Sequence, residues 1–317
     1  MENLFAAWRE FKRGKTKKQD VAEFAANLEE NIFNLHGQLA SGFYKHGQYK
    51  HFVICDPKRR DIHKASVDDR LLHHAVVRKL TPIFERGFIY DSFSSRKGKG
   101  VLAAVNRFQK LVWRLSRNKT KNVWVLKCDI KKFFDSIDHA VLFALCRKNI
   151  CDEQVHSLLW EIIMSFETKC GKGIPLGNLT SQLFSNVYLN PLDQFVKREL
   201  RVKNYIRYAD DFVILSCNKN YLESLLPVIS SFLESNLNIS LHSRKVLFRK
   251  YHQGVDFLGY VQYPNYRVLR TRTKRRIVRK VNENNMQSYL GLLTHGKGRK
   301  LRCYIKNMVR WQNDGKG

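Results

Sequence analysis

The sequence predicts an α+β fold, and three kinds of segment indicate it. In residues 205–216, β-favouring side chains flank the pair Asp210-Asp211, a pattern typical of two strands joined by a tight turn. Residues 123–129 form an apolar run that ends in Asp129 and predicts another strand. Apolar residues at helical spacing, such as Phe24, Leu28, Ile32 and Leu35, predict that residues 1–50 are mostly helical, and they predict further helices in 101–117 and 221–237. The helix that follows the Gly-rich turn at 171–177 is expected to continue through 187–200.

The composition limits what the chain can be. Its 317 residues, 44% of them hydrophobic, suffice for one large or two to three smaller subdomains. The net charge of +29 indicates a polyanionic partner; an acidic membrane is the weaker alternative, because no long apolar run is present. Seven Cys without a Cys-x-x-Cys pair indicate neither a disulfide framework nor a zinc site. The first residues lack a signal-peptide pattern, so we expect a reduced, cytoplasmic protein.

Three aspartates are the candidate catalytic residues. Acidic pairs are common in turns, so turn chemistry alone would explain an isolated Asp210-Asp211. The strand that ends in Asp129 changes this interpretation, because two strands that bring carboxylates together can bind divalent cations. Mg²⁺ binds through one or two carboxylates plus substrate phosphates, and two such ions hold both reacting oxygens of a phosphoryl transfer. The sequence therefore predicts a polymerase-type metal site.

At these residues the sequence resembles the reverse transcriptases. Tyr-Ala-Asp-Asp at 208–211 matches the signature of that family, and Asp129 matches its first catalytic aspartate. The matches keep the family's order from about residue 50 to about residue 262. The resemblance implies a right-hand polymerase fold, with the N-terminal helix and fingers in 1–122, a palm in 123–262 with further finger elements around 150–180, and a basic thumb in 263–317. It also implies dNTP substrates and two Mg²⁺ ions, replaceable by Mn²⁺, that are bound by Asp129, Ile130, Asp210 and Asp211.

Two basic segments resemble the fingers of this family. Residues 45–61 read as a hairpin with a basic tip, which alone would be no more than a solvated turn. The resemblance implies that Arg60 and Arg70, the latter just before a helix, neutralise the nucleotide's triphosphate. In residues 93–100, cations and glycines resemble a phosphate-binding motif that opens a helix, and an ordinary Gly-rich loop is the alternative. Its nucleic-acid-binding residues would be Arg96, Lys97 and Lys99.

Phe134 lies five residues after Asp129, where reverse transcriptases carry an aromatic gate. A ring beneath the sugar would clash with a 2′-hydroxyl, which distinguishes RNA from DNA building blocks. The alternative is that Phe133 and Phe134 are core residues, and at least one of them is expected in the core. The family register favours Phe134 as the gate, so the product should be DNA.

Residues 171–186 resemble the family motif that lies under the template and nucleotide. Its nucleotide-binding positions would be Leu176, Gly177, Ser181 and Gln182. The common form of the motif has Gln in place of Leu176 and Pro in place of Gln182. The form found here resembles that of the reverse transcriptases of diversity-generating retroelements. Because the amide contact is lost, discrimination between correct and mismatched nucleotides should fall.

Three later segments extend the resemblance. Residues 239–246 alternate like a strand and resemble a further motif of the family, which implies that Lys245 lies near the nucleotide's phosphates. Residues 255–260 resemble the primer grip, made of Phe257, Leu258 and Gly259, in which the glycine lets the primer backbone approach. From residue 265 onward there are 15 Lys and Arg and two acids, which predicts a basic helix in 269–281. It resembles a thumb that follows duplex phosphates, and a solvated tail is the alternative. Its contacts would be Lys274, Arg275, Arg276, Arg279 and Lys280.

The resemblance implies an RNA-directed DNA polymerase that makes cDNA from a template RNA and binds the RNA/cDNA duplex. The retroelement form implies errors at template adenines for mutagenic retrohoming, and a small basic accessory helical-bundle protein, itself oligomeric, as partner. From the sequence we expect no maturase, endonuclease or RNase H domain. Alternatives are a reverse transcriptase of a retron, of a group II intron-like element or of a phage-defence system, and a non-catalytic RNA-binding scaffold, against which the three aspartates argue.

Overall fold

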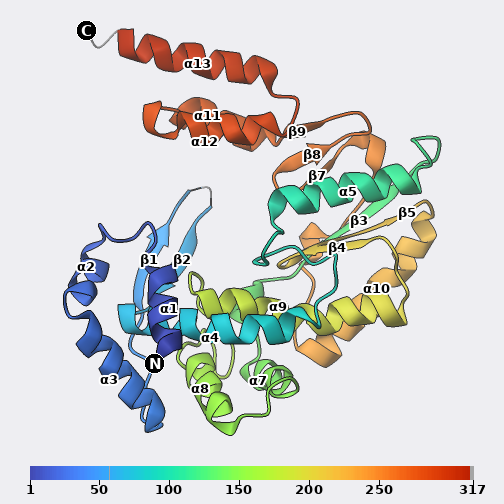
Figure 1. Cartoon of the computed structure of the whole chain (residues 1–317). Coiled ribbons are helices and arrows are strands. Elements are labelled where there is room, and N and C mark those ends of the chain that lie inside the picture. Colours follow the sequence, from blue (N-terminus) through green and yellow to red (C-terminus); the bar gives the residue numbers. More distant parts are fainter. Residues whose placement is uncertain (57, 315–317) are drawn as a thin grey trace. The chain divides into compact units, whose positions relative to one another are not determined.

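The computed structural model describes residues 1–56 and 58–314, with side chains up to residue 309. The chain forms two compact units, each assembled from three separate segments (Figure 1). The first unit comprises Met1–Ser95, Ile130–Arg201 and Val228–Leu241. The second unit comprises Arg96–Asp129, Val202–Pro227 and the chain from His242 onward. Helices and strands occur in both, so the predicted α+β class is confirmed, whereas the three predicted domains stay a prediction.

The first unit is mainly helical and carries one β-hairpin. Its helices are α1 (Glu2–Phe11), α2 (Gln19–Ala26), α3 (Leu28–Ala40), α4 (Val67–Glu85), α6 (Phe133–Ser136), α7 (His139–Arg147), α8 (Glu153–Met164) and α9 (Leu179–Gln194), which continues as the π-helix η1 (Phe195–Glu199). The predicted hairpin is confirmed as β1 (Lys50–Ile54) and β2 (Arg60–Lys64), paired antiparallel. The expectation that residues 1–50 are mostly helical is confirmed by α1, α2 and α3, and the chain turns at Asn27 (φ −118°, ψ 43°) between α2 and α3.

Helix α9 forms the centre of the first unit. It packs against α4 and α7, and Figure 1 shows α4 and α9 side by side. Tyr188 of α9 is fully buried, and its hydroxyl donates to the carbonyl of Leu237 and accepts from the amide of Asp138 (3.1 Å). Asn186 donates to the carbonyl of Ser94 (2.9 Å). These bonds satisfy polar groups that would be costly to bury alone, so they fix the helix along its length.

The second unit is built on a four-stranded antiparallel sheet in the order β4-β5-β3-β6. Its strands are β3 (Trp124–Asp129), β4 (Tyr205–Tyr208), β5 (Asp211–Ser216) and β6 (Leu247–Lys250), and α5 (Val101–Leu115) contacts β4 and β5. Helix α10 (Lys219–Leu237) contributes residues to both units. The helices predicted in 101–117 and 221–237 and the strands flanking Asp210 are thereby confirmed.

The strand predicted over 239–246 is wrong. Residues Ser243–Lys245 form a 3-10 turn (η2), and β6 begins only at Leu247. The amide of His242 donates to the carbonyl of Asp129 (2.8 Å), and the amide of Lys245 donates back to the carbonyl of His242 (2.8 Å). This turn ends the extended run and directs Lys245 towards Asp129.

The rest of the second unit holds a small sheet and three helices. The sheet, ordered β7-β8-β9, consists of β7 (Val255–Phe257), β8 (Tyr260–Gln262) and β9 (Arg267–Leu269), preceded by the 3-10 turn η3 (Tyr251–Gln253). The helices are α11 (Thr271–Lys280), α12 (Glu283–Thr294) and α13 (Arg299–Asp314). The predicted basic helix is confirmed as α11, in which Ile277 is fully buried while Arg275, Arg279 and Lys280 are exposed.

The cysteines and the helices bear on two expectations for the whole chain. All seven cysteines lie in the described part of the chain and carry free thiols, as expected from their spacing. Among the described helices, none combines the length and the apolar character needed to cross a bilayer.

Candidate active site

The three predicted catalytic aspartates meet at one end of the two central strands, β3 and β5, of the sheet in the second unit. Asp129 ends β3 and lies directly opposite Asp211, the first residue of β5. Residues opposite each other on antiparallel strands project from the same face, with Cβ atoms about 4.5–5.5 Å apart. Asp210 stands in the tight turn between β4 and β5, where Ala209 adopts a φ of 52°. The structure therefore brings together the carboxylates that the sequence singled out.

Burial and the closeness of the three carboxyl groups shift the pKa values of Asp210 and Asp211 at this end of the sheet. Burial, followed by the charges of Asp211 and Asp129, raises the pKa of Asp210 to about 6. Burial also raises the pKa of Asp211, while the nearby ammonium of Lys127 opposes that rise. Lys127 Nζ lies 3.8 Å from Asp211 Oδ1, and Lys245 Nζ lies 2.7 Å from Asp129 Oδ1.

The carboxylates of Asp129, Asp210 and Asp211 suit a divalent cation that binds together with a substrate phosphate. Among the described residues, no three His, Cys, Asp or Glu side chains are placed to hold a metal ion by themselves. Mg²⁺ is usually held by one or two carboxylates together with water and substrate phosphates. Burial, and then repulsion from Asp211 and Asp129, raise the pKa of Asp210, and such an ion would compensate the negative charge of the ionised carboxylate. Ile130 is buried and bridged to Leu241, and its place among the metal ligands stays a prediction.

A separate cleft of about 1010 Å³ lies within the first unit, lined by β2, the start of α6 and the loop before α9. Of the predicted nucleotide-binding residues, Arg60 and Leu176 line it. The carbonyl of Leu176 accepts from the amide of His63 (3.2 Å), which joins the loop to the hairpin. Gly177 has a φ of 113°, and a Cβ there would lie 3.1 Å from Ile62 Cγ2. A glycine is therefore required at this close approach.

The aromatic pair Phe133-Phe134 divides as the sequence suggested. Phe133 is buried (2% exposed), which confirms that at least one of the two rings belongs to the core. Phe134 is partly exposed, its ring meets that of Phe133 edge-on at 5.4 Å, and its carbonyl accepts from the amide of Ile174 (2.9 Å). The partly exposed ring is available for the gate role, which stays a prediction.

Three other predicted nucleotide-binding residues do not line this cleft, namely Arg70, Ser181 and Gln182. Arg70 falls inside the first turn of α4 rather than ahead of the helix, and its guanidinium contacts Asp20 (2.5 Å) and the ring of Phe11. Ser181 is buried in the first turn of α9, whereas Gln182 is exposed. The binding roles proposed for these residues stay predictions.

The predicted primer grip and basic loop belong to the second unit. Phe257 is fully buried and stacks on Phe108 (5.4 Å). Leu258 and Gly259 form the turn between β7 and β8 with φ values of 51° and 91°, and the space around Gly259 is open. The loop that holds Arg96, Lys97 and Lys99 precedes α5. The positive φ shows that Gly259 serves the turn itself, independently of any primer contact.

The sequence reasoning missed most cations of the cleft and the polar contacts of Lys127. The cleft is lined by Arg59, Lys131, Lys132, Lys169 and Lys172 in addition to Arg60. Lys131 and Lys132 follow Asp129 almost directly, which was a usable signal. Lys127 also shares a strand face with Asp129, because strand side chains alternate, and its ammonium donates to the carbonyl of Asp256 (3.2 Å).

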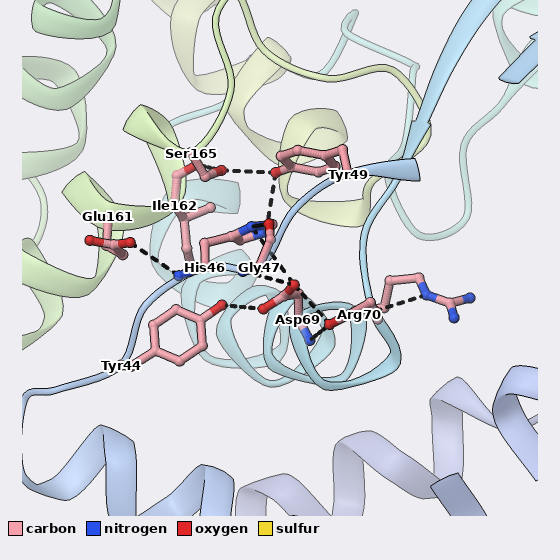
Figure 2. A network of polar contacts seen from close by, with 10 residues as sticks. Tyr44, His46, Gly47, Tyr49, Asp69, Arg70, Glu161, Ile162 and Ser165 are labelled. Atoms are coloured by element: carbon pink, nitrogen blue, oxygen red, sulfur yellow. Dashed lines mark hydrogen bonds and ion pairs between the residues drawn. The ribbon is translucent and has the colours of Figure 1, made fainter. Parts of the chain in front are cut away.

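A buried polar network around Asp69 anchors the start of the hairpin (Figure 2). The Asp69 carboxylate accepts from the hydroxyl of Tyr44 (2.6 Å), the amide of Gly47 (3.2 Å) and the hydroxyl of Ser66 (2.8 Å). Asp69 is 2% exposed, and a Cβ on Gly47 would lie 3.0 Å from its Oδ2. Burial, then the charge of Asp69, raises the pKa of Tyr44, so its hydroxyl stays protonated and donates.

A second group of contacts holds the same segment to α8. Glu161 accepts from the amide of His46 (3.0 Å), and the hydroxyl of Tyr49 lies 2.8 Å from that of Ser165 (Figure 2). Glu161 also accepts from the ammonium of Lys45 (2.9 Å). Residues 44–49 are thereby fixed between α4 and α8 before β1 begins. This fixes the base of the hairpin that carries Arg60.

Comparisons with known proteins agree with the geometry. The sequence profile of the family described as "Reverse transcriptase (RNA-dependent DNA polymerase)" matches residues 45–262. Protein YkfC of Escherichia coli K12 is 25% identical over 312 residues, which cover 85% of this chain and 80% of that protein. Group II intron-encoded protein LtrA of Lactococcus lactis subsp. cremoris is 24% identical over 303 residues, which cover 73% of this chain and 49% of LtrA.

A solved structure supports the fold. Apo telomerase from Candida tropicalis superimposes with a TM-score of 0.50 at 14% identity, covering 75% of this chain and 52% of the telomerase chain. The chain thus spans about half the length of LtrA and of that telomerase chain. At this identity the likeness concerns the fold alone, and it agrees with the predicted polymerase fold.

Proposed function

This chain belongs to the reverse transcriptase family of RNA-dependent DNA polymerases, and on that premise we propose that it makes cDNA from a template RNA at Asp129, Asp210 and Asp211. The observation that supports this site most strongly is the register of Asp129 opposite Asp211, with Asp210 in the adjoining turn. A non-catalytic scaffold would have no need for three carboxylates whose burial, and then whose proximity, raise the pKa of Asp210 to about 6.

In the proposed reaction, the 3′-oxygen of the primer bonds to the α-phosphorus of a dNTP, and the bond from that phosphorus to the pyrophosphate oxygen breaks. Divalent ions held at the aspartates would stabilise the charge on the attacking and leaving oxygens. Mg²⁺ is the ion that the oxygen donors suit best, with Mn²⁺ as a substitute. No side-chain nucleophile is needed, because positioning and charge carry this chemistry. Lys245 would exchange its ion pair with Asp129 for a phosphate oxygen of the substrate.

We further propose that this polymerase is error-prone at template adenines and serves mutagenic retrohoming. The support is Leu176, an aliphatic residue that lines the nucleotide cleft where the family's common motif has an amide. An aliphatic side chain cannot donate a hydrogen bond to the nascent pair, and one lost polar contact is worth about 1–3 kcal/mol of discrimination. A small basic accessory protein is part of this proposal. Because both proteins would be basic, the RNA between them would have to supply the compensating charge.

A second candidate is a group II intron-like reverse transcriptase. The observation that favours it is the match to the intron-encoded protein LtrA across 73% of this chain. In that case the enzyme should reject mismatched nucleotides opposite template adenines as well as it does opposite the other template bases.

One experiment separates these possibilities. The chain is supplied with a defined RNA, an annealed primer, dNTPs and Mg²⁺, and the cDNA is sequenced. Errors concentrated opposite adenines would support the retroelement proposal, with Leu176→Gln lowering them about 10- to 100-fold. The apolar variant Leu176→Met is the matched control and should keep the wild-type pattern. A low and even error spectrum would favour the group II intron-like candidate, and the absence of any cDNA would contradict both.

A further inference from the structure

Four lysines line the cleft of the first unit. Lys131 and Lys132 line one part of it, and Lys169 and Lys172 lie on the turn formed by residues 168–173, named here the lysine turn. Among the described residues, none of these four ammonium groups forms an ion pair or a hydrogen bond with another side chain. Arg59 and Arg60 add to the same cleft, against the carboxylates of Asp61 and Asp135. Such an excess of positive charge suits an anionic ligand.

Among the described residues of the first unit, some lysines are paired, as Lys45 is with Glu161 and Lys197 with Asp91, whereas the four lysines of the cleft belong to those without an ion pair. Glu167, beside the lysine turn, accepts from the amide of Gly171 (3.2 Å) instead of from a lysine. The local acid therefore stabilises the turn and leaves its ammonium groups available.

The lysine turn has a fixed shape. Thr168 donates its hydroxyl to the carbonyl of Asp135 (2.9 Å), and the amide of Lys172 donates to the carbonyl of Lys169 (2.8 Å). Gly173 has a φ of 107°, and a Cβ there would lie 2.7 Å from Thr168 Oγ1. The turn is thus closed on itself and held against the segment that follows α6. Cations on a preformed turn lose less freedom when they bind a ligand than cations on a mobile loop.

The cleft matches a nucleotide better than an RNA strand. It has an apolar part at Ile174 and Leu176 and a cationic part at the four lysines. A nucleoside triphosphate has the same division between base and sugar on one side and phosphates on the other. The volume of about 1010 Å³ is at the upper end of the size of small-molecule sites. A single strand would instead need an extended groove for about 4–16 nucleotides.

We propose that Lys169 and Lys172 bind the β- and γ-phosphates of the incoming nucleotide and hold the pyrophosphate after the bond has formed. This rests on the proposed polymerase function and deepens it, because it assigns a phosphate-binding role to the turn ahead of α9. The two lysines determine affinity for the phosphate tail, and they are not catalytic residues.

The first test is protection of a thiol by inorganic pyrophosphate without any metal. Cys170 lies between the two lysines, is exposed and lines the cleft. Pyrophosphate in EDTA should slow its alkylation, read by peptide mass spectrometry, at least several-fold, and leave the exposed Cys151 of the same unit unaffected. Equal alkylation of Cys170 with and without pyrophosphate would overturn the proposal.

The second test uses charge-matched double variants. Lys169→Gln with Lys172→Gln should raise the KM for dNTP and for pyrophosphate in the reverse reaction about tenfold, with kcat and RNA affinity unchanged. Lys79→Gln with Lys148→Gln removes two exposed lysines of the same unit outside the cleft and should change neither KM. Lys169→Arg with Lys172→Arg should retain wild-type values.

The outcomes distinguish this proposal from the proposed function. A wild-type enzyme that extends the primer, together with a Gln double variant of unchanged KM, would overturn only the lysine-turn assignment. Loss of RNA affinity with unchanged KM for dNTP would also overturn it, because the turn would then hold RNA. A wild-type chain that makes no cDNA would contradict the polymerase function, while the protection of Cys170 would still report on the phosphate site.

Discussion

The ammonium of Lys245 lies 2.7 Å from Oδ1 of Asp129, and this ion pair connects the 3-10 turn η2 to the end of β3. Lys245 is 47% exposed and Asp129 14% exposed, so the lysine has room to leave while the carboxylate stays. A cation bound at Asp129 would repel the ammonium. Metal binding and the Lys245 pair therefore compete for the same carboxylate.

The first prediction follows from this competition. Lys245→Met should tighten the apparent affinity for Mg²⁺ by a few-fold, because an exposed ion pair is worth about 0.2–1 kcal/mol. It should also lower kcat, because the contact of Lys245 with substrate phosphates is lost. The Mg²⁺ affinity is measured from the Mg²⁺ dependence of primer extension and of thermal unfolding, and kcat is measured from primer extension. Arg244→Gln, in the same turn, is the matched control, and equal Mg²⁺ affinity in wild type and Lys245→Met would contradict the competition.

A second prediction concerns the stability of the chain in EDTA. The pKa of Asp210 is raised from 3.8 to about 6, by burial and then by Asp211 and Asp129. Between these pH values the folded state keeps a proton that the unfolded chain has lost, so Asp210 makes the fold progressively less stable as the pH rises. Asp210→Asn cannot ionise and should be more stable than wild type by about 1–3 kcal/mol near neutral pH.

Urea unfolding at about pH 4 and about pH 7.5 measures this effect. The gain should be small at the lower pH and close to full at the higher pH, since Asp210 of the folded chain is ionised only there. Glu30→Gln, at an exposed position, should show no such dependence. A variant less stable than wild type near neutral pH would show that Asp210 is stabilised by contacts rather than strained by charge.

A third prediction tests the gate. Phe134→Ala should raise incorporation of ribonucleotides relative to dNTPs about 10- to 100-fold, because the ring would no longer exclude a 2′-hydroxyl. Phe133→Leu is the control. It should lower the melting temperature, because Phe133 is buried, and leave sugar discrimination as it was. If Phe134→Ala rejects ribonucleotides as well as wild type does, Phe134 serves packing alone.

The fourth prediction concerns the Asp69 network. Asp69→Asn should cost about 1–3 kcal/mol of stability, because Tyr44, Gly47 and Ser66 all donate to the carboxylate and an amide cannot accept all three. It should also raise the KM for dNTP, since the base of the hairpin carrying Arg60 is loosened. Asp68→Asn, at an exposed neighbouring position, is the matched control for denaturant unfolding and kinetics. Wild-type stability in Asp69→Asn would show that the network does not fix the hairpin.

Much of the fold and of the aspartate cluster was predictable because the signals are local. The strands around Asp129 and Asp210 are short apolar runs, and the turn lies where the acidic pair interrupts them. The strand expected over 239–246 is limited to a single bridge at Leu241, because the amide of Lys245 bonds to the carbonyl of His242 and closes a turn there.

The lysine turn and the Asp69 network were missed for a related reason. Lys172 is brought to the cleft by a β-bridge with Asp138, and Asp69 meets Tyr44 across 25 positions of sequence. Periodicity describes which face of an element is apolar, and it carries no information on which polar groups from distant segments will meet.

The central claim is that RNA-templated DNA synthesis takes place at the aspartate cluster. The most direct measurement is single-turnover addition of a dNTP to a primer on an RNA template, by wild type and by Asp210→Asn, with RNA affinity measured in parallel. Wild type should extend, and the variant should be slower by at least about 10²–10³-fold while binding RNA equally well, because basic surfaces carry the affinity. Extension by Asp210→Asn at the wild-type rate, with the variant fully folded, would contradict the assignment of the active site.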